Sequence, residues 1–238
     1  MVRGRLENLY QQHAFTLLLV ALLLTLVLTP QFEGSRVDTL LFTVSLTTVF
    51  ITGTLANRDR KWVFRAALVI AGLAVPISWG LLFFEERTLN FGQYVVIILF
   101  CGMTAVMVLL SVLRSRLRTG QAVVGAICVY LLIGLTWATI YQSIEMVEAE
   151  PFHYAARRTT GHGDQATTAF SQLVYFSFVT MTTLGYGDIS PRTALAETAC
   201  WLEAIVAQLY LAILIARLVS EIPVIRHEAS GEGRDEDD

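Results

Sequence analysis

The feature that most constrains this sequence is the uneven placement of its charged residues. Seven stretches of the chain contain no Asp, Glu, Lys or Arg. These stretches are residues 8–32, 39–57, 66–84, 88–113, 119–144, 165–187 and 204–216. A membrane-spanning helix needs about 20 mostly apolar residues, and most of the stretches meet or approach that length. We therefore expect an integral membrane protein.

Composition and cysteine usage agree with this expectation. Of the 238 residues, 55% are hydrophobic and 16% are charged, whereas soluble domains carry roughly 25% charged residues. The net charge of −3 gives no basic surface for nucleic acid. Cys101, Cys128 and Cys200 lie in separate apolar stretches without a C-x-x-C pair, which argues against a metal site or a disulfide framework. A soluble enzyme, a nucleic-acid binder and a disordered protein are excluded.

The apolar stretches predict an all-α membrane protein with six transmembrane helices. Their expected ranges are 14–28, 38–56, 62–84, 91–113, 121–146 and 193–220. No small-x-small cleavage site follows the first range, so we interpret it as an uncleaved span. With both termini in the cytoplasm, 12 of the 17 Lys and Arg residues fall inside and 5 outside, as the positive-inside rule requires. The expected location is the plasma membrane.

A more specific signal lies between the last two predicted helices. Residues Thr180 to Asp188 read T-M-T-T-L-G-Y-G-D. This stretch resembles the signature of the potassium-channel family, T-x-x-T-x-G-Y-G-D, at all six fixed positions. The resemblance extends over roughly residues 121–220. It implies a re-entrant pore helix at 168–182, a selectivity filter after it, and a pore-lining inner helix after Pro191.

The residue types of this signature suit potassium chemistry. Carbonyls of Thr183, Leu184, Gly185 and Tyr186, with the Thr183 hydroxyl, can replace the water shell of K⁺ when four copies surround one axis. Aiming successive carbonyls inward requires alternating left-handed backbone, which explains Gly185 and Gly187. The negative end of the pore helix dipole would favour a cation. Helix-packing motifs of small residues use G-x-x-x-G spacing instead.

One filter segment cannot enclose a pore by itself. Only one G-Y-G occurs in the chain and no internal repeat is visible. We therefore expect a homotetramer with four-fold cyclic symmetry. Its expected partners are further copies of this chain, membrane lipid and K⁺ as the permeant ion; no cofactor and no nucleic acid are expected.

The resemblance also implies a set of residues that support the filter from behind. These are Thr182, Asp188, Tyr175, Phe176 and Val179, with Tyr186 and Asp188 bonding to the surrounding helix. The chain departs from the common pattern in three places. Leu184 replaces the usual valine, Tyr175 and Phe176 stand where many members have two tryptophans, and Val179 stands where some carry a glutamate. We hypothesise a filter held by fewer polar contacts.

The inner helix supplies candidate cavity and gate residues. By family register, Gln208, Leu211, Ile215 and Val219 should face the cavity, and Ala207 occupies the place of a common hinge glycine. Ile215 and Val219 form either a hydrophobic constriction that gates by dewetting or an ordinary packed stripe. Both alternatives stay open at this point.

Glu203 is the one acid within the apolar part of the inner helix. Carboxylates inside a membrane are expensive and usually functional. Glu203 is expected either to bond pore-helix hydroxyls such as Ser177 or Thr180, which would be structural, or to respond to pH.

Three regions of the chain are predicted, with different roles. Residues 1–118 form a four-helix membrane domain, residues 119–222 the pore domain, and residues 223–238 a disordered acidic tail. A voltage sensor needs several regularly spaced basic residues in its fourth helix, but 91–113 carries no charge. Conventional voltage sensing is therefore not expected.

The function predicted from sequence is passive, potassium-selective conduction. Two alternatives are a weakly selective cation channel and a non-conducting modulatory subunit. A membrane enzyme is not expected, because neither H-E-x-x-H nor G-x-S-x-G occurs.

Overall fold

The computed structural model describes residues 2–28, 87–114, 119–157, 159–160, 167–168 and 170–220, with scattered positions between 44 and 76. The predicted spans 38–56 and 62–84 and the predicted tail 223–238 lie wholly or mostly outside these residues. The described helices are α1 (Val2–Leu28), α4 (Arg87–Arg114), α5 (Thr119–Val147), α6 (Phe170–Met181) and α7 (Ala194–Ser220). The strands are β1 (Phe152–Tyr154), β2 (Thr159–Thr160), β3 (Thr167–Thr168) and β4 (Ile189–Pro191).

Three helices of the described part are long and apolar enough to cross a membrane. They cover Phe91–Leu110, Gly120–Val147 and Ala194–Arg217. They coincide with the predicted spans 91–113, 121–146 and 193–220. The apolar part of α1, Phe15–Leu28, is shorter. The total of six spans stays a prediction.

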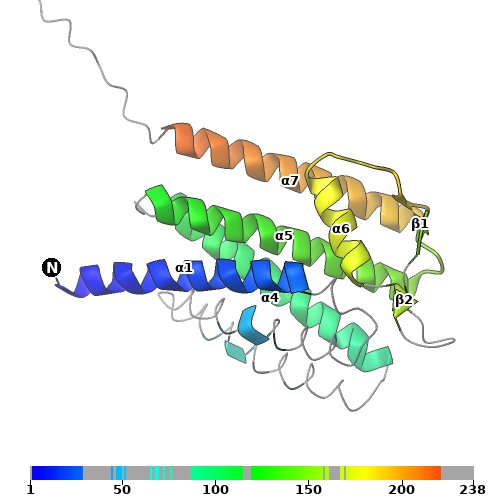
Figure 1. Ribbon diagram of the computed structural model, residues 1–238, viewed down its shortest axis with the longest axis horizontal. Helices are drawn as coiled ribbons and strands as arrows, with labels where there is room; N and C mark the ends of the chain where they lie inside the picture. The colour runs from blue at the N-terminus through cyan, green and yellow to red at the C-terminus, as the bar shows by residue number, and fades with distance from the viewer. Residues whose placement is uncertain are drawn as a thin grey trace, which may run out of the picture.

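Helix α5 is the centre of the described structure. It packs against α1, α4, α6 and α7, and Figure 1 shows these helices gathered around it. A helix with neighbours on several sides must be apolar nearly all round, as the sequence of α5 is. Close contact with α4 occurs at Gly125, where an added Cβ would lie 2.9 Å from Val112 Cγ2. Small residues permit such close approach between membrane helices.

Helix α6 is short and lies beside both α5 and α7, toward the end of the molecule where the strands are found (Figure 1). Its contact with α5 depends on Gly134. A Cβ at Gly134 would lie 2.6 Å from Cζ of Phe178, so only glycine leaves room for this ring. The observed α6 agrees with the predicted pore helix at 168–182 to within two residues.

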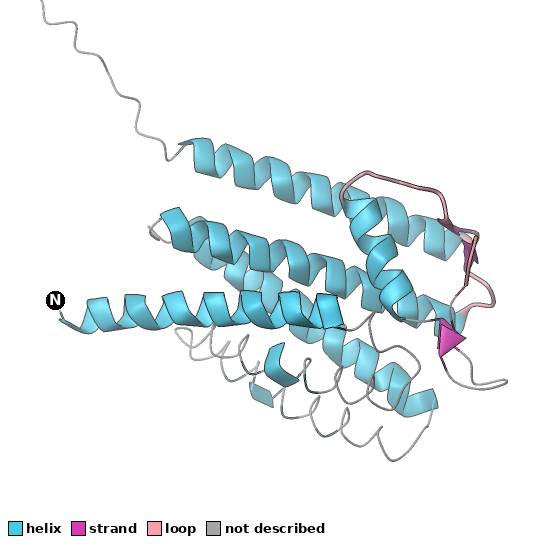
Figure 2. Ribbon diagram, viewed as in Figure 1, coloured by secondary structure: helices cyan, strands magenta, loops and turns pink. Residues whose placement is uncertain are grey.

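The strands form two short antiparallel pairs at one end of the helices (Figure 2). β1 pairs with β4 in the register Phe152↔Pro191, His153↔Ser190 and Tyr154↔Ile189, and β2 pairs with β3. The β1–β4 pair is extended by backbone bonds from Ala155 N to Asp188 O and from Arg192 N to Pro151 O. The segment that follows α5 is thus joined to the segment that follows residues 182–188.

An aromatic cluster fills the space between this strand pair and the helices. The ring centroid of Phe176 lies 5.2 Å from that of Tyr141 and 5.5 Å from that of Phe152. Tyr141 and Phe152 lie 5.4 Å apart at a nearly perpendicular angle, the edge-to-face arrangement that aromatic pairs prefer. All three side chains are buried. The cluster joins α5, β1 and α6 into one unit.

Helix α7 buries one narrow stripe inside the chain. Buried positions recur with helical spacing at Ala196, Ala199, Glu203, Ala207 and Tyr210. The other apolar side chains of α7 are largely exposed within a single copy. The helix continues without interruption through Ala207, as expected where alanine replaces a hinge glycine.

Candidate functional site

The loop after α6 begins with an unusual helix terminus. Leu184 N donates to Val179 O at 3.0 Å and Thr183 N donates to Thr180 O at 3.0 Å. These two bonds form a Schellman motif, in which the residue after the helix adopts left-handed backbone. Glycine usually fills that position, but here it is Thr183, with φ of 60°. A left-handed β-branched residue costs roughly 1–2 kcal/mol.

The left-handed conformation recurs at every second residue of the loop. Gly185 has φ of 54° and Gly187 has φ of 77°, so residues 183, 185 and 187 alternate with residues of ordinary φ. No atom lies within 4 Å of a Cβ added at either glycine. The requirement for glycine is therefore conformational and not steric. Such alternation lets successive carbonyls point to one side of the chain.

The side chains of this loop are not covered by the rest of the same chain. Leu184 is 57% exposed and Tyr186 is 66% exposed. Thr182 is also exposed, and its hydroxyl donates to Phe178 O at 2.6 Å. A single copy thus leaves open the loop that the sequence analysis assigns to the filter.

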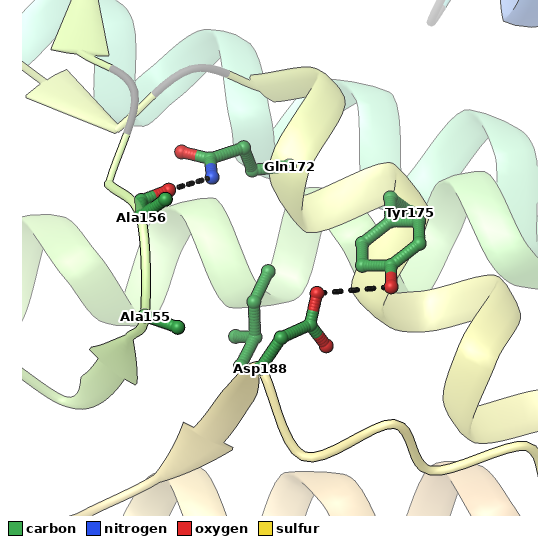
Figure 3. Close-up of a pocket in the computed structure, with 6 residues that line it drawn as sticks. Ala155, Ala156, Gln172, Tyr175 and Asp188 are labelled. Atoms are coloured by element: carbon green, nitrogen blue, oxygen red, sulfur yellow. Dashed lines mark hydrogen bonds between the residues drawn. The ribbon is translucent and has the colours of Figure 1, made fainter.

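Asp188 attaches the end of the loop to α6. The Tyr175 hydroxyl donates to Asp188 Oδ2 at 2.9 Å (Figure 3). The two residues line a small pocket with Ala155, Ala156, Gln172 and Ile189. Across that pocket, Gln172 Nε2 donates to Ala156 O at 2.7 Å. The far end of the loop is therefore held by the Tyr175–Asp188 bond to α6 and by the β1–β4 pairing.

The other two predicted support residues lie in apolar surroundings. Phe176 belongs to the aromatic cluster with Tyr141 and Phe152. The side chain of Val179 is buried, and its carbonyl accepts the Leu184 bond of the helix terminus. Neither side chain can donate a hydrogen bond to Asp188, in line with the hypothesis of few polar contacts.

Glu203 lies in a buried contact among three helices. Its side chain is fully buried. The Tyr141 hydroxyl of α5 donates to Oε2, and Ser177 Oγ of α6 lies 2.5 Å from Oε1. Ser177 Oγ also lies 2.9 Å from Gly134 O. Ser177 is one of the two partners expected from the sequence. Tyr141 was not expected, because an aromatic residue in an apolar helix gives no sign in the sequence of a polar partner.

The cavity and gate candidates of α7 occupy different environments. Gln208 Nε2 donates to Met181 O, the last carbonyl of α6, at 3.3 Å. Leu211 is half-buried and packs against the core that α5 shares with α1 and α4. Ile215 and Val219 are 59% and 60% exposed. The chain therefore covers Leu211 in part and leaves Ile215 and Val219 exposed.

Two further structural contacts of this region had no signal in the sequence. One is the β1–β4 pair, whose strands are too short for a recognisable alternation. The other is the bond from the Tyr210 hydroxyl to Ala126 O at 2.6 Å, which joins α7 to α5. Both rest on residues far apart in the chain.

Comparison with known proteins agrees with this geometry. No curated protein matches the chain. A family model described as "Ion channel" matches residues 125–222. The matched range runs from Gly125 in α5 through α6 and the loop to the end of α7, and it contains the alternating segment and Glu203. Residues 125–222 are thus similar to an ion-channel domain.

Proposed function

We propose that four copies of this chain form a passive potassium-selective channel whose filter is Thr183–Gly187. The observation that carries the proposal is the left-handed backbone at Thr183, Gly185 and Gly187. It occurs inside the only T-x-x-T-x-G-Y-G-D segment of the chain. Irregular backbone at membrane depth is tolerated where it lines a water-filled path, and a row of carbonyls is a potassium ligand set.

The proposed ligands are backbone atoms, so most side-chain identities matter little for coordination. Carbonyls of Thr183, Leu184, Gly185 and Tyr186 from four copies would form stacked oxygen rings, with the Thr183 hydroxyls as a further ring. Leu184 supplies the same carbonyl as valine would. Gln208 adds an amide at the end of α6, where its bond to Met181 O keeps the pore helix and inner helix together.

The proposed homotetramer would explain the exposed surface of a single copy. Besides the loop, α7 exposes Trp201, Ile205, Leu209 and Ile213. Lipid can cover some of this surface, but it cannot cover a polar filter backbone. Cyclic four-fold assembly would place the filter on the axis and bury it among copies.

The proposed channel does not use a conventional voltage sensor. The charged residues of α4 stand at its two ends, Arg87 and Arg114. Moving charge through the field is worth about 2.3 kcal/mol per charge per 100 mV, and the interior of α4 offers none. The role of α1 and α4 in this proposal is to hold α5.

Flux through purified protein tests the proposal. The full chain is reconstituted in liposomes. The mass of the assembly in the membrane is measured, together with barium-sensitive K⁺ efflux. We expect a tetramer that releases K⁺, and no release from Gly187→Ala, because alanine at φ of 77° is strained. A well-folded tetramer without K⁺ efflux would favour the modulatory-subunit alternative and contradict the proposal.

A further inference from the structure

Three oxygen–oxygen contacts at hydrogen-bond distance surround Glu203, but the two hydroxyl groups involved carry only two protons. The contacts are Tyr141 to Oε2, Ser177 to Oε1, and Ser177 to Gly134 O. A tyrosine or serine hydroxyl carries one proton and can donate once. Three contacts need three protons, and Tyr141 and Ser177 supply two. The third proton has one available place, the carboxyl group of Glu203.

A protonated carboxyl completes the chain of donors. Tyr141 donates to Oε2, the carboxyl proton on Oε1 is donated to Ser177 Oγ, and Ser177 donates to Gly134 O. Every oxygen in this chain is then satisfied without a buried charge. An ionised carboxylate would take both hydroxyl protons and leave the Ser177–Gly134 contact unfilled. It would also add the cost of burying an ion, which amounts to several kcal/mol.

Among the described residues, the contacts of Glu203 are to hydroxyl groups and include no basic side chain. The ion pairs Arg157–Glu145 and Arg192–Glu150 both lie outside the core of α7. The titratable groups that face the carboxyl are Tyr130 and Tyr141 from α5 and Cys200 from α7, with Glu197 beside Cys200. All of these become negative when they lose a proton. Helix α6 presents Ser177, which does not titrate.

We infer that Glu203 is a proton-carrying positioning residue, a neutral acid that joins α7 to α6 and α5 behind the filter. The consequence for conduction rests on the proposed channel function, whereas the protonation state does not. Neutral Glu203 holds Ser177, which lies six residues before Thr183 on the helix that leads into the filter. Loss of the proton removes one contact of this helix and adds an uncompensated charge beside it.

Infrared spectroscopy of the full-length protein tests the protonation state directly. At neutral pH, the wild type should show the C=O stretching band of a protonated carboxylic acid, and Glu203→Gln should lack it. Glu197→Gln is the matched control, since Glu197 is an exposed acid on the same helix, and it should keep the band. Tyr141→Phe should move the band to higher frequency, because the carbonyl oxygen Oε2 loses its donor. A folded wild type without the band, or a band that persists in Glu203→Gln, would overturn the inference.

Thermal stability gives a second readout. A glutamine amide can donate to Ser177 and accept from Tyr141, so Glu203→Gln keeps all three contacts. In the wild type, the folded state holds a proton that the unfolded chain releases above roughly pH 4.3. The melting temperature of the wild type should therefore fall relative to Glu203→Gln as pH rises from acidic to neutral. A difference that does not change with pH would contradict the inference. If the wild type conducts no K⁺ but shows the band, the proposed function fails and the assignment of Glu203 stands.

Discussion

Thr183 has two roles, one at the end of α6 and one at the start of the proposed filter. It ends α6 through the bonds of Thr183 N and Leu184 N, and it begins the row of proposed ligands. Glycine at this position would remove the strain of the left-handed backbone, but glycine has no hydroxyl group that could serve as a ligand. Strained backbone persists where the surroundings over-determine it, and it clusters at functional sites. The strain at Thr183 thus marks the start of the site.

Substitution of Gly185 tests the conformational requirement. In Gly185→Ala, the new methyl group meets no atom within 4 Å, so the expected cost of roughly 1–2 kcal/mol per subunit comes from the left-handed backbone. We predict loss of K⁺ efflux with retention of the tetramer. Gly92→Ala is the control, because a Cβ there also meets nothing within 4 Å but φ is ordinary. Equal efflux from the wild type and Gly185→Ala would contradict this account of the loop.

Tyr175 tests how much the Asp188 contact contributes to the filter. Tyr175→Phe removes the hydroxyl that donates to Asp188 Oδ2. We predict a faster decline of current during sustained conduction, with an unchanged reversal potential. Tyr154→Phe removes a hydroxyl that donates to Glu145 and not to a residue of the loop, and should decline like the wild type. Identical time courses for all three proteins would show that this contact does not support the filter.

At the scale of elements, the packing of α6 on α5 depends on one missing methyl group. Gly134 lies under the Phe178 ring, and an added Cβ would come within 2.6 Å of it. The Gly134 carbonyl also accepts from Ser177. The same position of α5 therefore supplies space for one residue of α6 and a polar contact for another. This explains why a central helix of apolar residues contains a glycine at that point.

A double substitution measures this packing. Gly134→Ala should destabilise the tetramer by roughly 1–3 kcal/mol, as overpacked cores do, and should reduce efflux. Adding Phe178→Leu shortens the clashing side chain and should recover part of the melting temperature. Gly102→Ala in α4, where an added Cβ has no neighbour within 4 Å, should melt like the wild type. Additive effects of the two substitutions would mean that the contact does not couple the helices.

Helices were easier to predict from the sequence than the contacts between them. The bounds of α5, α6 and α7 agree with expectation to within two residues, because apolar length and the G-Y-G-D signature define them. The Tyr141–Glu203 and Tyr210–Ala126 bonds join residues more than 60 positions apart. No local pattern encodes such pairs, since a tyrosine in an apolar helix is equally compatible with lipid, core or a polar partner.

At the scale of the whole molecule, the described helices are arranged around α5. α5 holds α1 and α4 on one side and α6 and α7 on the others. The start of α1 and the end of α7 lie at the same end of the helices, opposite the β1–β4 pair (Figure 1). This arrangement is compatible with the predicted topology, in which both termini are cytoplasmic and the strand pair is extracellular. The ion-channel match covers α5 from Gly125 to α7 and does not include α1 or α4.

The absence of charge within α4 leads to a prediction about voltage. Because α4 carries charge only at its ends, a change of membrane potential exerts little force on the interior of this helix. We predict that the open probability of single channels in planar bilayers varies little with voltage. A steep increase of open probability on depolarisation would show that charged residues elsewhere in the chain sense the field.

Reversal potentials under bi-ionic conditions test whether the backbone carbonyls of Thr183–Gly187 select potassium. Channels made from this chain alone are placed between equal concentrations of K⁺ and Na⁺ on opposite sides of a bilayer. We expect a reversal potential far from zero, with the sign of a membrane permeable to K⁺ and nearly impermeable to Na⁺. A reversal potential near zero would mean that K⁺ and Na⁺ pass equally well, and it would contradict potassium selectivity in favour of a weakly selective cation channel.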